Sequence, residues 1–118
     1  MPQFIVLLYD DPTHWKEMPP SELQAAFGKY GAWGKKGRQS GYIVAGNKLY
    51  DDSGKVLRGK NTVATDGPYS ETKEVLGGYY ILEAASYEDA VRLCLDHPHL
   101  EFGGTIGLRQ IEPMPTTS

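Results

Sequence analysis

Two segments of this chain are apolar on both faces of the strands that they would form. Phe4–Tyr9 and Gly77–Ala84 are rich in aromatic, aliphatic and β-branched residues, and neither alternates with polar residues. A strand with one solvated face alternates cleanly, whereas a strand covered on both faces does not. Any fold for this chain must therefore cover both sides of a sheet that contains these two strands.

The rest of the sequence supplies two helices and a polar excursion between them. Apolar residues at helical spacing predict helices at about Ser21–Gln39 and Ser86–Asp96. Each begins at a serine whose hydroxyl can cap the first turn, with Gln24 or Asp89 three residues later. The other predicted strands are Tyr42–Ala45, Val56–Arg58, Thr62–Ala64 and Thr105–Ile111, with a hairpin tip at Asp51–Gly54.

This order, β-α-β, hairpin and β-α-β, is typical of the ferredoxin-like, split βαβ class of α+β folds. Both helices then cover one face of an antiparallel sheet. No segment remains for the other face, so a second copy of the same sheet, giving a twofold homodimer, is the simplest cover. We expect one domain over residues 4–113 and a frayed tail at residues 114–118.

Composition narrows the classes of partner and compartment. The net charge of −3 over 118 residues argues against nucleic acid or an anionic membrane surface, because both select clustered Lys and Arg. The single cysteine, Cys94, cannot form an intrachain disulfide, which favours the cytoplasm. The first residues lack the basic region of a signal peptide, and their apolar run is too short to span a membrane.

The segment TDGPYSETKE, Thr65–Glu74, joins turn chemistry to a charged run. Backbone needs alone explain its Asp-Gly-Pro turn. If the segment faces a cleft, Asp66 and Glu71 could act as acid and base, Tyr69 could shape the pocket, and Lys73 could steer an anion. If it faces water, the charges only keep the surface solvated.

Two further residues, His97 and Trp15, have both a functional and a structural interpretation. His97 is either a titrating acid or base near neutral pH or a histidine that interacts with the last carbonyls of a helix. Trp15 is either a lid over a cleft or part of the core. Cys94 lies on the apolar stripe of the second helix, which favours a buried thiol. The spacing of Cys94, His97 and His99 matches no standard zinc site, so we expect no metal.

The segments TDGPYSETKE and VLGGYYILEA together resemble the DGPF signature of the YCII-related family, and the likeness extends from Phe4 to Pro113. The resemblance implies a dimeric ferredoxin-like α+β barrel with one cleft per subunit. Some relatives act as dehydrochlorinases or isomerases on muconolactone-type lactones, using a His and an Asp. By spacing, that helix His falls near Lys29 or Tyr30, and an Asp-Pro pair of the family matches His97-Pro98.

Two functions are consistent with these observations. The first is a small-molecule enzyme that acts on an organic acid or lactone by proton transfer, with no cofactor. Its acid and base candidates are Asp66, Glu71 and His97, and its substrate-binding candidates are Tyr69, Lys73 and Trp15. The second is a non-catalytic ligand-binding or regulatory partner, because relatives of the DGPF branch are often encoded beside extracytoplasmic-function sigma factors.

Overall fold

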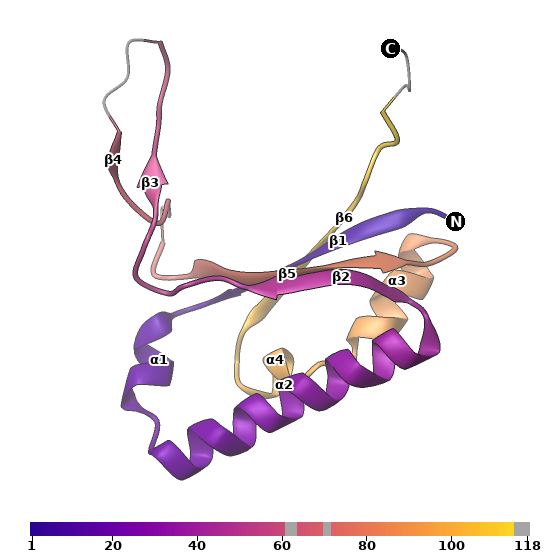
Figure 1. The fold of residues 1–118 in the computed structure, drawn as a ribbon, viewed down its shortest axis with the longest axis horizontal. Helices are drawn as coiled ribbons and strands as arrows, with labels where there is room; N and C mark the ends of the chain where they lie inside the picture. The colour runs from indigo at the N-terminus through magenta and orange to yellow at the C-terminus, as the bar shows by residue number, and fades with distance from the viewer. Residues whose placement is uncertain (61–63, 70–71, 115–118) are drawn as a thin grey trace.

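A four-stranded antiparallel sheet forms the centre of the molecule in the order β2-β5-β1-β6 (Figure 1). The computed structural model describes residues 1–60, 64–69 and 72–114. The strands are β1 (Gln3–Asp10), β2 (Ile43–Lys48), β5 (Val75–Glu83) and β6 (Thr105–Gln110). Each neighbouring pair is antiparallel. The α+β class and the antiparallel sheet predicted from the sequence are therefore confirmed.

All the helices of the described chain lie on one side of this sheet (Figure 1). The long helix α2 (Pro20–Ser40) and helix α3 (Tyr87–Cys94) correspond to the two predicted helices. The short helices α1 (Pro12–Glu17) and α4 (Pro98–Glu101) were not predicted, because one or two turns are too few to show a hydrophobic period.

The helix ends follow the sequence in part. Gly41 ends α2 with a φ of 87°, in the left-handed region that glycine adopts most easily. The Ser86 hydroxyl accepts a hydrogen bond from the backbone N–H of Asp89, as predicted. The capping box predicted at Ser21 does not form, since α2 already begins at Pro20 and has no side-chain cap. Proline suits the first helical position because the N–H that it lacks would have no partner there.

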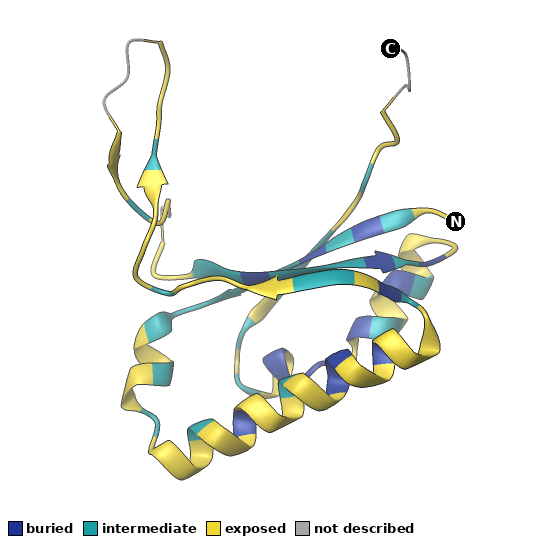
Figure 2. Ribbon diagram, in the orientation of Figure 1, coloured by how far each residue is buried: buried dark blue, intermediate teal, exposed yellow. Residues whose placement is uncertain are grey.

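The core lies between the sheet and the helices (Figure 2). Phe4, Val6 and Leu8 alternate along β1 and point to this side, where Leu82 of β5 and Trp33 of α2 meet them. Their burial stabilises the fold, since each large apolar side chain contributes roughly 1.5–3 kcal/mol.

The other face of the sheet carries apolar residues that nothing in the described chain covers. Ile5 of β1 lies opposite Ile81 of β5 and Arg109 of β6, and all three point away from the helices. Ile5, Leu7 and Ile81 are only half-buried there, and no described helix lies over them (Figure 2). We call this surface the open face.

A separate two-stranded hairpin, β3 (Lys55–Val56) and β4 (Thr65–Asp66), projects from the side of the open face (Figure 1). Lys55 pairs with Asp66 and Val56 with Thr65. The prediction of a hairpin tip at Asp51–Gly54 is wrong. The carbonyl of Gly54 accepts from the N–H of Gly67, which places Gly54 at the base of the hairpin.

Candidate functional site

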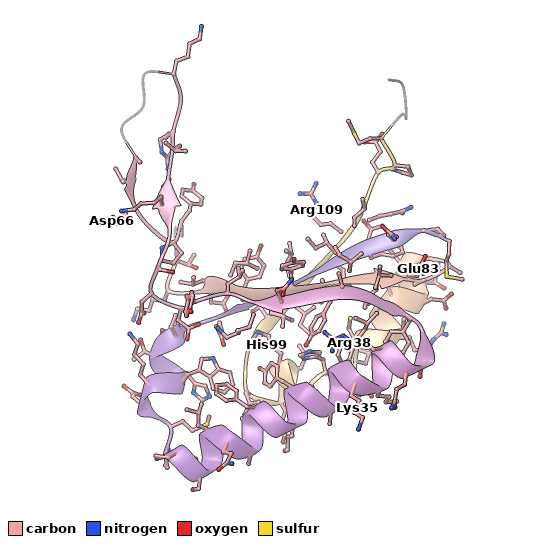
Figure 3. All side chains as sticks on the ribbon, viewed as in Figure 1. Lys35, Arg38, Asp66, Glu83, His99 and Arg109 are labelled. Carbon is pink, nitrogen blue, oxygen red and sulfur yellow. The ribbon has the colours of Figure 1, made fainter. Side chains whose placement is uncertain are left out.

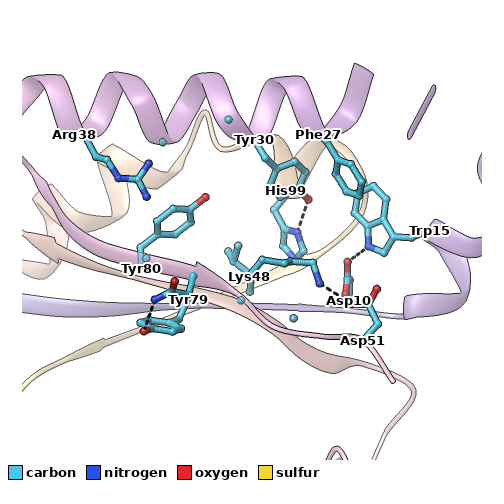
Figure 4. A pocket seen from close by; sticks show the side chains of 17 residues that line it. Asp10, Trp15, Phe27, Tyr30, Arg38, Lys48, Asp51, Tyr79, Tyr80 and His99 are labelled. Carbon is cyan, nitrogen blue, oxygen red and sulfur yellow. Dashed lines mark hydrogen bonds and ion pairs between the residues drawn. The ribbon is translucent and has the colours of Figure 1, made fainter. Parts of the chain in front are cut away.

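A cavity of about 440 Å³ lies between helix α2 and the helix-facing side of the sheet (Figure 4). Its size is within the range of about 300–1,000 Å³ that is usual for small-molecule sites. Trp15, Phe27 and Tyr30 form an aromatic wall, and the Trp15 ring contacts both of the others. The polar side chains of Arg38, from α2, and Tyr80, from β5, enter the cavity at a distance from this aromatic wall (Figure 4).

Glycines form much of the two opposite walls. Gly31 and Gly34 line the cavity from α2, and Gly46 and Gly78 line it from the sheet. A Cβ atom at Gly34 would lie 3.0 Å from Nη1 of Arg38, and one at Gly46 would lie 2.7 Å from the ring of Tyr80. Glycine at these positions therefore leaves room for the Arg38 and Tyr80 side chains beside the backbone.

The first of two tyrosine–histidine pairs joins α2 to α4. Nε2 of His99 lies 2.7 Å from the carbonyl oxygen of Tyr9, and Nδ1 of His99 lies 2.7 Å from the Tyr30 hydroxyl. A carbonyl only accepts, so Nε2 carries the proton of the neutral ring and Nδ1 is an acceptor. The Tyr30 hydroxyl therefore donates to His99 and keeps its own lone pairs free.

In the second pair, His97 and Tyr80, the hydrogen bond runs from the histidine to the tyrosine. The backbone N–H of His99 donates to Nδ1 of His97 at 2.9 Å, which leaves the proton of the neutral ring on Nε2. Nε2 of His97 lies 3.3 Å from the Tyr80 hydroxyl. Tyr80 therefore accepts from His97, and its own O–H is free to donate. One tyrosine of the cavity is thus arranged as an acceptor toward a ligand and the other as a donor.

Burial keeps His97 and the two tyrosines neutral. His97 is 2% exposed, and burial, together with the charge of neighbouring His99, lowers its pKa to about 4. Burial also raises the pKa of Tyr30 and of Tyr80 above the ordinary value of a phenol. Neither tyrosine is therefore ionised near neutral pH, and either can take part in proton transfer only as a neutral hydroxyl.

Charged groups lie at separate places in the cavity (Figure 4). Arg38 lies beside Tyr80, where its charge opposes the rise of the Tyr80 pKa that burial causes. Lys48 is paired with Asp51 at 2.8 Å. Asp10 accepts a hydrogen bond from the indole N–H of Trp15 at the aromatic end. The cavity therefore has a cationic end at Arg38 and an anionic end at Asp10.

Comparison with known families identifies the chain. A YCII-related domain matches residues 3–115, which is almost the whole sequence. The chain belongs to the YCII-related family. The family expected from the sequence motif is therefore confirmed, and the cavity is a feature of a YCII-related domain.

Solved structures contain the same fold. The 5-chloro-2-hydroxyhydroquinone dehydrochlorinase of Burkholderia phenoliruptrix, solved with 2,5-dihydroxybenzoquinone, matches this YCII-related chain with a TM-score of 0.50. The match covers 93% of each chain at 17% sequence identity. An identity this low supports the fold alone. No curated protein is significantly similar to this chain.

Three of the residues predicted from the sequence as a site lie in three different places. Trp15 lines the cavity. His97 does not line it and lies behind Tyr80, in contact with the ring of Trp33 at a centroid distance of 4.4 Å. Asp66 lies on the projecting hairpin, across the sheet from His99 and Arg38 (Figure 3). Its carboxylate is exposed and pairs with Lys55.

Tyr69 and Lys73 follow Asp66 along the chain and do not line the cavity. Tyr69 is exposed and lies under the guanidinium of Arg58, 5.4 Å from its ring centroid. Lys73 is exposed and adds a small contribution to the lowered pKa of Asp11, which comes mainly from hydrogen bonds with Thr13. Glu71 lies outside the described residues. The structure therefore does not bring Asp66 and His97 together in the cavity.

Two other classes of site find no candidate in the described chain. Across residues 1–60, 64–69 and 72–114, no three His, Cys, Asp or Glu side chains are grouped so that they could hold a metal ion. Over the same ranges, no helix is both long enough and apolar enough to cross a membrane. Cys94 is buried, and burial raises its pKa to about 11, so it remains a thiol at neutral pH.

Proposed function

We propose that this protein is a small-molecule enzyme that moves a proton on an organic acid or lactone bound in the cavity under α2. The observation that carries the proposal is the pair of neutral tyrosines with opposite hydrogen-bond directions. Tyr30 donates to His99 and can accept from a ligand, whereas Tyr80 accepts from His97 and can donate. Acid–base catalysis needs one group that accepts a proton and another that donates one in the same site.

The proton would leave the substrate through Tyr30. As the Tyr30 oxygen takes a proton from the carbon next to a carbonyl, its own proton passes to Nδ1 of His99. The imidazolium that forms is stabilised by the carbonyl of Tyr9, which holds its Nε2–H. Because burial raises the pKa of Tyr30, this concerted route is easier than ionising the phenol first.

The developing charge on the substrate would be stabilised at the other end of the cavity. The electron pair of the broken C–H bond moves to the carbonyl oxygen and gives an enolate. The O–H of Tyr80 donates to this oxygen, and the nearby guanidinium of Arg38 offsets the charge. Return of the proton from Tyr30 to a different carbon of the enolate completes an isomerisation.

The comparisons agree with this proposal at a coarser level. By spacing, the helix His that the resemblance implies falls near Lys29 or Tyr30, and the family's Asp-Pro matches His97-Pro98. The Tyr30 and His97 rings lie 5.3 Å apart. The structurally similar dehydrochlorinase acts on a small oxygenated ring. We therefore assign Tyr30, His99 and Tyr80 to proton transfer and Trp15 to the cavity wall.

Hydrogen–deuterium exchange tests the proposal without knowledge of the natural substrate. A panel of small carboxylates and lactones is incubated with the protein in D₂O, and exchange at the carbon next to the carbonyl is followed by NMR. We expect catalysed exchange for part of the panel, and a loss of at least tenfold in Tyr30→Phe and in Tyr80→Phe. Tyr50→Phe, which changes an exposed tyrosine outside the cavity, serves as the matched control.

The alternative is a non-catalytic ligand-binding or regulatory protein. It is favoured if members of the panel bind and none exchanges with any variant. Exchange that persists unchanged in Tyr30→Phe would instead contradict the relay through His99 and leave a different base to be found.

We further propose that the open face is covered by a second copy of the chain, giving the dimeric ferredoxin-like barrel. Ile5 and Ile81 lie opposite each other at its centre, where two apolar sheets would meet. The radius of gyration is 16.1 Å, whereas a compact chain of this length has about 13.5 Å. The excess is consistent with the projecting hairpin, whose exposed Leu57 would find cover on a partner.

A further inference from the structure

We propose that Arg38 is the anion-binding residue of the cavity and that the ligand is a flat organic acid with a single negative charge. The inference rests on the proposed function only in that the cavity binds the substrate. It adds the chemical class of the ligand, its direction in the cavity and the residue that selects it.

The surroundings of Arg38 favour a bound anion. Within the described part of the chain, no hydrogen bond or ion pair joins its guanidinium to another residue. Two other cations of α2 do have partners, since Lys29 pairs with Glu101 and Lys36 with Asp96. Arg38 lines the cavity and points toward Tyr80, whereas Lys35 points away from the sheet (Figures 3 and 4).

The chemistry of Arg38 matches a carboxylate in particular. Its planar fork of N–H donors can hold both oxygens of a carboxylate at once. The free O–H of Tyr80 beside it offers one more donor to the same group or to a neighbouring oxygen. Gly34 permits this arrangement, because the Arg38 guanidinium occupies the position next to where a side chain would begin.

The walls of the cavity select a flat molecule. Gly31 on α2 and Gly77 and Gly78 on the sheet present backbone rather than side chains to the space between them. A planar ring can approach such walls closely, and it can also contact the aromatic wall of Trp15, Phe27 and Tyr30. A puckered ring of the same formula is thicker and loses part of these contacts.

The charge at the far end limits the ligand to one anionic group. Lys48 is neutralised by Asp51, and the Asp10 carboxylate lies at the Trp15 end of the cavity. A second carboxylate on the ligand would meet Asp10 and be repelled, because like charges in a partly enclosed site cost more than in water. A hydroxyl group at that end would instead donate to Asp10.

Binding of three probes tests the inference. We compare 4-hydroxybenzoate with terephthalate, which carries a second carboxylate, and with cyclohexanecarboxylate, which is not flat. By isothermal titration calorimetry we expect 4-hydroxybenzoate to bind, and the other two to bind at least tenfold more weakly. No binding by 4-hydroxybenzoate, or equal affinity for all three probes, would overturn the proposed ligand class.

Substitutions in α2 test whether Arg38 is the residue that binds the carboxylate. We expect Arg38→Met to weaken the binding of 4-hydroxybenzoate at least tenfold and Arg38→Lys to weaken it less. Lys35→Met should leave the affinity unchanged. Asp10→Asn should improve the affinity for terephthalate relative to 4-hydroxybenzoate. Because Arg38 is exposed, its replacement should leave the fold intact, which circular dichroism verifies. Unchanged affinity in Arg38→Met would refute the assignment.

The binding experiments can fail or succeed independently of the proton-exchange experiment that tests the proposed function. Binding that depends on Arg38 in a protein that exchanges no proton supports the inference and contradicts the enzyme. Proton exchange by a protein in which Arg38→Met changes no affinity supports the enzyme and contradicts the inference.

Discussion

The backbone N–H of His99 donates to Nδ1 of His97 at 2.9 Å, and this bond fixes the tautomer of the His97 imidazole. His97 is the N-terminal cap of α4, and His99 lies within that helix. The cap leaves the proton of His97 on Nε2, where it faces Tyr80, while the carbonyl of Tyr9 leaves Nδ1 of His99 free for Tyr30. Helix α4 therefore sets the hydrogen-bond direction at Tyr80, and α4 together with the Tyr9 carbonyl of β1 sets it at Tyr30.

We expect the protein to become less stable as the pH is lowered, because of His97. Burial lowers the folded-state pKa from 6.5 to about 4, so the unfolded chain binds this proton more readily between these values. The contribution is fully present above pH 6.5 and is lost as the pH falls toward 4. At most it amounts to roughly 3 kcal/mol. Urea denaturation at a series of pH values measures the slope.

The matched variant is His97→Asn, in which the amide oxygen can still cap α4. We expect it to lower stability at pH 7 and to flatten the slope over this interval. His14→Asn, which changes an exposed histidine, should keep the wild-type slope. An unchanged slope in His97→Asn would show that other groups cause the acid sensitivity.

We expect Tyr30→Phe to lower the free energy of unfolding by about 1–3 kcal/mol. The ring contacts of Tyr30 with Trp15 and Phe102 survive in phenylalanine, but Nδ1 of buried His99 loses its hydrogen-bond donor. Tyr50→Phe removes an exposed hydroxyl and should change stability by less than about 0.5 kcal/mol. Equal effects of the two substitutions in urea denaturation would argue against a donated bond from Tyr30 to His99.

The sequence predicted the parts of the fold whose signals are local. Gly41 and Ser86 mark helix ends because a left-handed residue and a capping hydroxyl act within one turn. The apolar pattern of Phe4–Tyr9 and Gly77–Ala84 predicted that the helices leave one apolar face of the sheet uncovered, which is the open face. The hairpin tip was misplaced because Asp51–Gly54 has turn composition, while the pairing of Lys55 with Asp66 depends on residues distant in sequence.

The site was harder to predict because tertiary contacts create it. Tyr80 and His99 gain their roles only when α4 packs against the sheet and α2. A usable signal was present for Arg38, which lies four residues after Gly34 and therefore on the same face of α2. The charged run that contains Asp66 drew attention by composition, and composition does not reveal that β4 projects away from the cavity.

We expect Ile81→Glu to convert the proposed dimer into a monomer. Ile81 lies at the centre of the open face, opposite Ile5, and a carboxylate there would lose its water when two sheets meet. Sedimentation velocity at micromolar concentration measures the change. Val91→Glu places the same charge on an exposed apolar residue of α3 in the helical layer and should leave the dimer intact. A wild-type protein that sediments as a monomer would refute the proposed dimer.

Two glycines of α2 should respond in opposite ways to the same substitution. A Cβ atom at Gly28 meets nothing within 4 Å, so Gly28→Ala should stabilise the protein by about 0.5–1 kcal/mol through helix propensity. A Cβ atom at Gly37 would lie 2.2 Å from Cδ1 of Ile43, so Gly37→Ala should destabilise it by about 1–3 kcal/mol despite the same gain in propensity. Urea denaturation compares both variants with the wild type. If both stabilised the protein, the close contact between α2 and β2 would not exist as described.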